Sequence, residues 1–89
     1  MKPVRVGVVG VGYLGRFHAQ KYAALPEARF AGVADINAER ARAVAAQHGV
    51  AAFTDYHDLL GAVDAVSIVV PTELHHRIAL DCLAAGVDV

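Results

Sequence analysis

Three glycines near the start of the chain constrain its fold more than any other feature. Gly10, Gly12 and Gly15 are spaced as G-x-G-x-x-G, with an apolar run before them and a helix-like run after them. A strand that turns through such glycines into a helix leaves backbone N–H groups free to hold a pyrophosphate. Asp35 ends the next apolar run, at the distance from Gly15 where an acid binds the adenosine ribose. The pattern therefore predicts a dinucleotide-binding turn.

The three glycines are expected to have different roles. Gly10 permits the tight turn out of the strand, and Gly15 lets the helix lie close against that strand. The missing side chain of Gly12 leaves room for the pyrophosphate. We expect the free amides from Gly12 through Tyr13 to Leu14 to point at the phosphates, aided by the helix dipole.

Composition narrows the class of protein. A chain of 89 residues makes at most one small domain, and its 56% hydrophobic content suits strands that are covered on both faces. A net charge of −1 without a basic cluster argues against nucleic acid as a partner. The single cysteine, Cys82, excludes an internal disulfide, and no Cys/His spacing predicts a metal site. Because no apolar run reaches the ~18 residues of a membrane span, we expect a cytoplasmic protein without a membrane partner.

Apolar runs of strand length alternate with helical patterns along the whole chain. This alternation predicts an α/β fold, a Rossmann-type doubly wound parallel sheet in three α/β/α layers. The expected strands are Val4–Val9, Arg29–Ala34, Ala51–Phe53 and Ala65–Val70, with a fifth that opens at Val87–Val89. The expected helices are Tyr13–Leu25, a second between the N-cap Asn37 and Gly49, Asp55–Leu60 and Glu73–Ala85.

Two of these helices carry further expectations. Pro26 should end the first helix, whose small residues Gly15, Ala19 and Ala23 should form a flat face against the sheet. Thr72 should cap the last helix. The residues of that helix expected to point inward are Leu74, Ile78, Ala79, Cys82 and Leu83.

The sequence stops three residues into the fifth expected strand. We therefore expect residues 1–89 to form an incomplete NAD(P)-binding domain, cut off in that strand, with a C-terminal substrate domain absent. Because an open strand edge recruits other chains, we also expect self-association of the fragment and a homo-oligomer for the parent protein.

A second group of candidate site residues, from Val70 to His75, follows the fourth expected strand. Ligands of open parallel sheets bind at the carboxyl ends of the strands where the strand order reverses, here between the first and fourth strands. Pro71 and Thr72 should therefore face the same crevice as the glycine turn. A histidine in a first helical turn serves packing more often than chemistry, so the residues themselves leave the role of His75 open.

The choice of cofactor rests on charge. Asp35 would accept hydrogen bonds from the ribose hydroxyls and repel a 2′-phosphate, which favours NAD over NADP. The alternative reading of Asp35 is a strand-end acid that starts a turn with Asn37. Arg40 either lies solvated on a helix face, which its charged neighbours favour, or reaches a 2′-phosphate. His57 is also expected to lie in solvent.

Four segments, read together, resemble one family. They are G-V-G-Y-L-G-R-F-H-A, V-A-D-I-N, D-A-V-S-I-V-V-P-T-E-L-H-H and A-G-V-D-V, and they are similar to the N-terminal domain of the Gfo/Idh/MocA family (glucose–fructose oxidoreductase, inositol dehydrogenase). The resemblance implies an NAD(P)-dependent oxidoreductase that transfers hydride at a sugar, cyclitol or related carbinol. The cofactor-binding residues that the motifs and the resemblance imply are Gly10, Gly12, Tyr13, Leu14, Asp35, Ile36, Val70, Pro71, Thr72 and His75.

In that family a Glu-Lys-Pro motif follows the fifth strand, and its lysine acts in catalysis. This sequence ends at Val89, before such a motif. The resemblance therefore implies that the 89 residues bind a dinucleotide and hold no catalytic residue. Two other function classes stay open. One is a non-enzymatic nucleotide-sensing module; the other, a methyltransferase that binds S-adenosylmethionine, would leave the block from Pro71 to His75 without a purpose.

Overall fold

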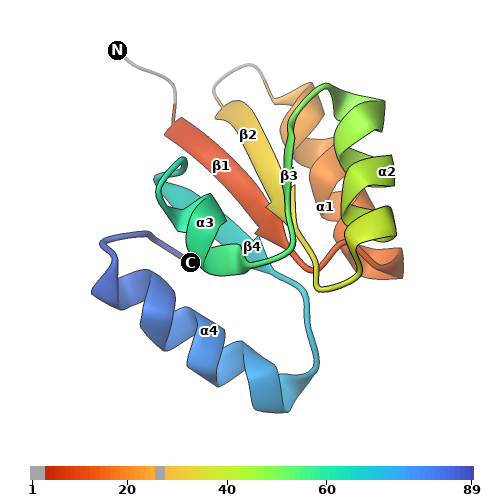
Figure 1. The fold of residues 1–89 in the computed structure, drawn as a ribbon. Coiled ribbons are helices and arrows are strands. Elements are labelled where there is room, and N and C mark those ends of the chain that lie inside the picture. The colour runs from red at the N-terminus through yellow and green to blue at the C-terminus, as the bar shows by residue number, and fades with distance from the viewer. Residues whose placement is uncertain (1–3, 26–27) are drawn as a thin grey trace.

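The computed structural model describes residues 4–25 and 28–89, and a four-stranded parallel sheet forms its centre (Figure 1). The strands are β1 (Val4–Val9), β2 (Ala28–Ala34), β3 (Ala51–Phe53) and β4 (Ala65–Ile68). They lie in the order β3-β2-β1-β4, and every neighbouring pair is parallel. Because the order reverses between β1 and β4, the sheet is doubly wound and its ligand crevice is expected there.

The helices of the described residues cover both faces of this sheet. They are α1 (Tyr13–Ala24), α2 (Ala38–His48), α3 (Tyr56–Leu60) and α4 (Thr72–Ala84). Strand alternation sends Val8 and Val33 into one core with α1 and α2, and Val9 and Ala34 into another with α3 and α4. Figure 1 shows α1 and α2 on one side of the strands and α3 and α4 on the other. The predicted three-layer α/β/α architecture is confirmed.

Two strand glycines fix the short helix α3 on the sheet. A Cβ atom on Gly7 of β1 or on Gly32 of β2 would lie 3.1 Å from Cδ1 of Leu59. The side chain of Leu59 is fully buried and therefore rests on the bare backbone of two neighbouring strands. A helix of five residues has no stability of its own, so α3 depends on contacts such as this one with the rest of the fold.

The predicted ends of α2 are confirmed, and the predicted start of α4 is wrong. Asn37 caps α2, because its side-chain oxygen accepts a hydrogen bond of 3.0 Å from the backbone N–H of Arg40, and Gly49 ends the helix with φ 66°. Thr72, however, is the first residue of α4, and Pro71 occupies the N-cap. The carbonyl of Pro71 accepts hydrogen bonds from the first-turn amides of α4, so the backbone starts this helix without a capping side chain.

Other boundaries differ from the prediction by one or two residues. Helix α1 ends at Ala24, strand β2 begins at Ala28, and α4 ends at Ala84. Strand β4 ends at Ile68 because its neighbour β1 turns away at Gly10, which leaves the amide of Val69 as the last donor to β1. Pro26, expected to stop α1, lies outside the described residues.

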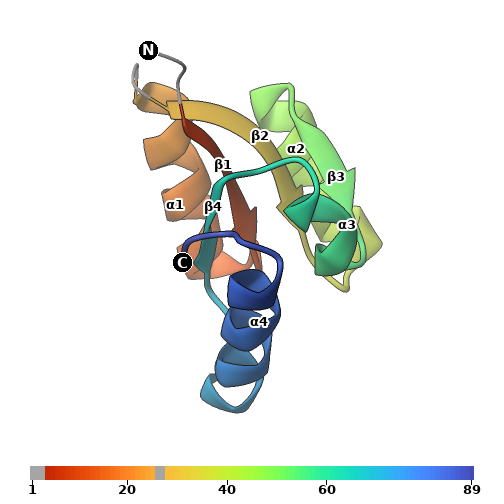
Figure 2. The ribbon, with the colours of Figure 1, turned by 90° about the vertical axis from the view of Figure 1, so that its left-hand side faces the viewer.

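The predicted inward faces of α1 and α4 are partly wrong. Ala19 is buried as expected, but Ala23 is exposed, and the hydroxyl of Tyr22 instead lies 2.6 Å from Oγ of Ser67 in β4. In α4, Ile78 and Cys82 are buried and Ala79 is half-buried, whereas Leu74 and Leu83 are exposed. Leu74 belongs to the N-terminal half of α4, which extends past the carboxyl ends of the strands (Figure 2).

Two polar contacts connect β4, an edge strand of the sheet, and the loop before it to other parts of the chain. Asp88 forms an isolated parallel bridge with Ala65, so the fifth strand expected at Val87–Val89 is placed beside β4. Arg5 and Asp64 join the start of β1 to the loop before β4, with 3.0 Å between Nη2 and Oδ1. Within residues 4–25 and 28–89, no helix has both the length and the apolar character needed to cross a membrane.

Candidate functional site

The glycine turn is built from backbone atoms that allow no side chain at two of its positions. Gly10 has φ 89°, and a Cβ atom there would lie 2.2 Å from the carbonyl oxygen of Val69. A Cβ atom on Gly15 would lie 1.9 Å from the carbonyl oxygen of Gly10. The predicted roles of Gly10 in the turn and of Gly15 in helix packing are therefore confirmed, and both have a steric cause.

Gly12 differs from these two glycines because it faces open space. It is the N-cap of α1 with φ −70°, which any residue can adopt. Among the described residues, a Cβ atom on Gly12 would meet Nη1 of Arg40, at 3.4 Å. Tyr13 and Leu14 form the first turn of α1, where helical amides lack intrahelical partners; their side chains lie outside the described part. The turn thus presents bare backbone to a space that could receive an anion.

Asp35, at the end of β2, is buried and already holds two backbone amides. Its Oδ2 accepts a hydrogen bond of 3.0 Å from the amide of Val11, and its Oδ1 accepts one of 2.9 Å from the amide of Asn37. The alternative interpretation of Asp35, a strand-end acid that starts a turn with Asn37, is therefore confirmed as a structural role. A carboxylate has about four lone-pair sites, so these two bonds leave acceptor capacity for a ligand hydroxyl.

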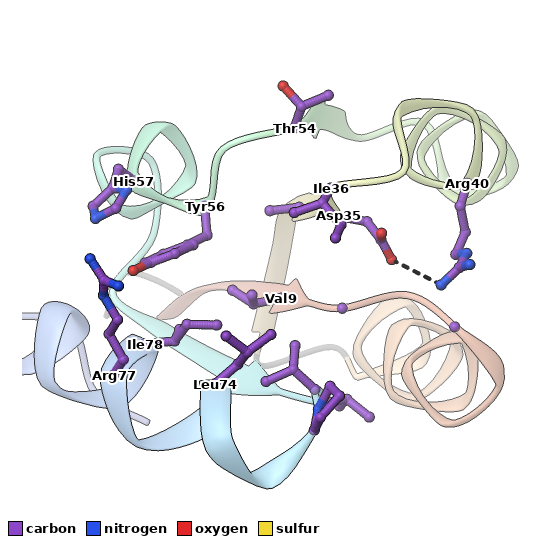
Figure 3. A pocket seen from close by; sticks show the side chains of 16 residues that line it. Val9, Asp35, Ile36, Arg40, Thr54, Tyr56, His57, Leu74, Arg77 and Ile78 are labelled. Atoms are coloured by element: carbon purple, nitrogen blue, oxygen red, sulfur yellow. Dashed lines mark ion pairs between the residues drawn. The ribbon is translucent and has the colours of Figure 1, made fainter.

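The side chain of Arg40 reaches from α2 to this carboxylate. Its Nη1 lies 3.6 Å from Oδ2 of Asp35, while 43% of the side chain stays exposed (Figure 3). The solvated helix-face position predicted for Arg40 is confirmed, and its contact with Asp35 was not predicted. Arg40 is exposed, but its guanidinium points toward Asp35 and stands beside Gly12, because Asn37 starts α2 directly after the Asp35 turn.

A cleft of about 430 Å³ opens at the carboxyl ends of the strands, a volume suited to a small-molecule ligand. Figure 3 shows Ile36 and Leu74 on its opposite sides, with Val9 between them. Asp35 and Arg40 lie at one end of this apolar slot. The other end is polar and is formed by α3 and α4, with Tyr56, His57 and Arg77.

The cleft brings together most, but not all, of the predicted cofactor residues. Those that line it are Gly10, Gly12, Asp35, Ile36, Val70 and Pro71. Thr72 begins α4 beside the cleft, and its side chain lies outside the described part. His75 is half-buried in the first turn of α4 and is not among the lining residues; its neighbour Leu74 lines the cleft instead.

Several lining residues were not predicted as site residues. They are Val9, Ala34, Arg40, Thr54, Tyr56, His57, Val69, Leu74, Arg77 and Ile78. Thr54 follows β3, so the rule that ligands bind at the carboxyl ends of parallel strands could have found it. Tyr56 and Arg77 carry no such signal, because they reach the cleft only through the packing of α3 and α4.

His57, expected in solvent, belongs to a polar cluster between α3 and α4. Its side chain is 58% exposed, yet Nδ1 lies 2.7 Å from Oδ1 of Asp55 and Nε2 lies 3.2 Å from Oδ2 of Asp81. Its ring stacks on that of Tyr56, with centroids 4.1 Å apart, and the hydroxyl of Tyr56 donates a hydrogen bond to Asp81. The hydrogen bond with Asp55 raises the pKa of His57. Burial, together with the bond to Asp81, raises the pKa of Tyr56 to about 12.

Neither metal nor thiol chemistry has support in the described part of the chain. No three His, Cys, Asp or Glu residues of ranges 4–25 and 28–89 gather as metal ligands would. Cys82 is buried in the core beside Ile78, and burial raises the pKa of its thiol, which makes the thiol unreactive.

A doubly wound parallel sheet, a glycine turn into α1 and a cleft at the strand-order reversal define a Rossmann-type domain. Residues 4–89 also match the model of the GFO/IDH/MocA family, described as an oxidoreductase family with an NAD-binding Rossmann fold. The chain belongs to this family. The resemblance noted in the sequence motifs is thereby confirmed.

Two relatives of the chain are dehydrogenases by name. The chain is 56% identical over 84 residues to UDP-N-acetylglucosamine 3-dehydrogenase of Acidithiobacillus ferrooxidans, a match over 94% of this chain and 26% of the relative. It is 40% identical over 83 residues to inositol 2-dehydrogenase of Rubrobacter xylanophilus, over 90% of this chain and 24% of the relative. The chain thus spans about a quarter of the length of these relatives.

Solved structures show the same fold. The Acidithiobacillus ferrooxidans UDP-N-acetylglucosamine 3-dehydrogenase superimposes with a TM-score of 0.90 at 55% identity, over 98% of this chain and 28% of that chain. Scyllo-inositol dehydrogenase of Lactobacillus casei, solved with bound NAD(H) and scyllo-inositol, gives a TM-score of 0.89 at 29% identity, over 97% and 26% of the two chains.

Proposed function

We propose that residues 1–89 are the NAD-binding part of a cytoplasmic oxidoreductase that transfers hydride between NAD and the carbinol of a sugar or cyclitol. The observation that carries this proposal is the cleft that joins the glycine turn, Asp35 and Pro71 at one edge of the sheet. The relatives act on UDP-N-acetylglucosamine and inositol according to their names, which supports the substrate class. We assign no catalytic residue to this chain and leave the substrate pocket to a further domain.

The residues of the cleft fit a dinucleotide. Bare backbone at Gly12 and the first-turn amides of α1 would hold the pyrophosphate, because the helix N-terminus favours an anion. Asp35 would accept hydrogen bonds from the ribose hydroxyls with its remaining lone pairs. The apolar slot between Ile36 and Leu74 would take the flat adenine ring. The bound nicotinamide would supply the hydride acceptor or donor, and this chain would position it.

The test is a substitution that fills the pyrophosphate space without disturbing the fold. In the described part of the chain, Gly12→Ala meets the flexible side chain of Arg40 and needs no unusual φ angle, so the variant should fold normally. We expect its Kd for NADH to rise at least about tenfold, because its methyl group would occupy the phosphate position. Gly61→Ala is the matched control, since Gly61 has φ −71° and lies outside the cleft.

Fluorescence titration of the full-length protein with NADH measures both variants, and their melting temperatures check the fold. Unchanged NADH binding in a folded Gly12→Ala variant would overturn the proposed position of the pyrophosphate. Failure of the unsubstituted protein to bind NADH would overturn the function.

We further propose that the site prefers NAD but tolerates NADP. Buried Asp35 would repel a 2′-phosphate, and a like-charge contact at a desolvated site costs several kcal/mol. Arg40, 3.6 Å away, offsets part of that repulsion. Arg40→Gln should therefore weaken NADPH binding more than NADH binding, which competitive titration of the two cofactors would measure. An equal effect on both would leave Arg40 without a part in the choice.

A further inference from the structure

The two long sides of the cleft are held together differently. The side that carries Ile36 follows directly from β2, in the middle of the sheet. The side that carries Leu74 is the N-terminal half of α4, which extends past the strand ends (Figure 2). The buried residues Ile78 and Cys82 hold α4 against the sheet, and the width of the slot at Leu74 depends on how closely α4 also lies against α3.

Side chains of α3 and its N-cap make this connection. Tyr56 donates a hydrogen bond from its hydroxyl to Asp81 of α4, and Nε2 of His57 lies 3.2 Å from the same carboxylate. On its other side, Nδ1 of His57 lies 2.7 Å from Asp55, which also caps α3 by accepting a hydrogen bond from the amide of His57. Tyr56 and His57 both line the cleft, so the connection stands at its polar end (Figure 3).

We propose that Asp55, Tyr56, His57 and Asp81 form a polar clasp that holds α4 against α3, sets the width of the slot and makes dinucleotide binding weaken as the pH rises. His57 and Tyr56 are positioning residues in this proposal. It rests on the proposed function for the identity of the ligand. The clasp itself rests only on the contacts between α3 and α4.

The donor count of the imidazole explains the direction of the effect. A protonated imidazole has two N–H donors, one for each flanking carboxylate, whereas a neutral imidazole has one. Asp55 has the shorter contact and is local to α3, so the neutral ring keeps its proton on Nδ1 and loses the bond to Asp81. Deprotonation of His57 therefore weakens the contact with α4, because only the hydrogen bond from Tyr56 to Asp81 remains.

The surrounding charges support the protonated form. Asp55 before α3 and Asp81 on α4 both raise the pKa of His57. The hydrogen bond from Tyr56 is the main cause that lowers the pKa of Asp81, and the charge of Arg77 on α4 adds to it. Arg77 also acts against the rise in the pKa of Tyr56. The pKa of His57 is raised in the folded protein. The clasp is therefore complete at a pH below the ordinary histidine pKa, and it is lost as the pH rises through the raised pKa of His57.

Titration of the full-length protein with NADH across about pH 5.5 to 8.5 tests the proposal. We expect the Kd to rise by about two- to fivefold across this range, the size of effect that exposed ion pairs have. His57→Gln, which cannot gain a proton, should flatten the profile. The matched control is His76→Gln, an exposed histidine of α4, which should keep the wild-type profile. A flat wild-type profile, or an unchanged profile in His57→Gln, would overturn the coupling.

A second measurement needs no ligand. The ring protons of His57, followed by NMR, should titrate above the ordinary histidine value of 6.5, and Asp81→Asn should lower the midpoint of His57 alone. An ordinary midpoint for His57, or an Asp81→Asn variant without effect, would overturn the clasp. If NADH does not bind at any pH, the proposed function and the coupling fail together, while the NMR titration still decides whether the clasp exists.

Discussion

The two ends of the cleft are held together by different kinds of contact. At the β1–α1 turn, backbone atoms meet backbone atoms, and Gly10 and Gly15 leave no space for a single added carbon. At the α3–α4 end, partly exposed side chains contact one another: Asp81 accepts a hydrogen bond from Tyr56 and lies close to His57. The first end is rigid because its backbone atoms are in close steric contact. The second is held by contacts that pH and single substitutions can weaken.

The largest effect should come from the rigid end. Gly15→Ala would place a carbon 1.9 Å from the carbonyl oxygen of Gly10, where no side-chain rotation can relieve the contact. We expect a loss of more than about 3 kcal/mol in the free energy of unfolding, above the usual range for overpacking because the clash is with backbone. Urea unfolding measures this loss. A variant as stable as Gly61→Ala would show that the turn is less rigid than described.

Removal of the anchor of α3 should have the next largest effect. Leu59→Ala deletes a fully buried side chain that fills the space above Gly7 and Gly32. We expect a loss of about 2 to 4 kcal/mol, since few atoms can move into the cavity. The same urea experiment applies. Leu80→Ala is the control, because Leu80 is 53% exposed, and equal losses in the two variants would contradict the anchor.

A capping substitution should have a smaller effect and leave the cleft intact. Asn37→Ala removes the side-chain oxygen that accepts the amide of Arg40. The expected cost is about 1 kcal/mol of unfolding free energy, measured by the same urea unfolding. Asn37→Asp should keep most of the wild-type stability, since aspartate caps as well as asparagine does. An Asn37→Asp variant as unstable as Asn37→Ala would point to a role of Asn37 beyond the cap.

The smallest effect should come from the surface pair between Arg5 and Asp64. Asp64 accepts from both the side chain and the amide of Arg5, and these bonds lower the pKa of its carboxyl below the ordinary 3.8. The pair therefore stabilises the fold above pH 3.8, and its contribution is lost as the pH falls through the lowered pKa. Asp64→Asn should lower the melting temperature slightly at neutral pH and not at all in strong acid. A double substitution with Arg5→Gln tests whether the two effects are coupled.

The sequence predicts the features that local backbone rules decide. The G-x-G-x-x-G turn and the caps of α2 at Asn37 and Gly49 all follow from the conformations that a few adjacent residues allow. The alternation of apolar strands with helical patterns likewise predicts the parallel sheet and the reversal of its strand order. The turn and the caps can be predicted because each lies within a short segment, whereas the sheet is predicted from a pattern that repeats along the whole chain.

Features decided by packing between distant segments could not be predicted in this way. Helical spacing places Leu74 beside Ile78, but only the extension of α4 past the strands exposes Leu74 in the cleft. The sequence predicts Arg40 and His57 as surface residues and does not predict their partners. Those partners, Asp35 and Asp81, come close only in the folded chain. Thr72 fits a capping pattern, yet the fixed backbone of Pro71 takes the cap position before it.

Ile36 stands in water at the rim of the slot, with 92% of its surface exposed. A branched aliphatic side chain in that position orders the water around it, and a flat ring laid over it would release that water. Such a complex has a lower heat capacity than its separate parts. Its enthalpy of formation would become steadily more negative with temperature, and part of that slope would disappear if Ile36 were replaced by serine.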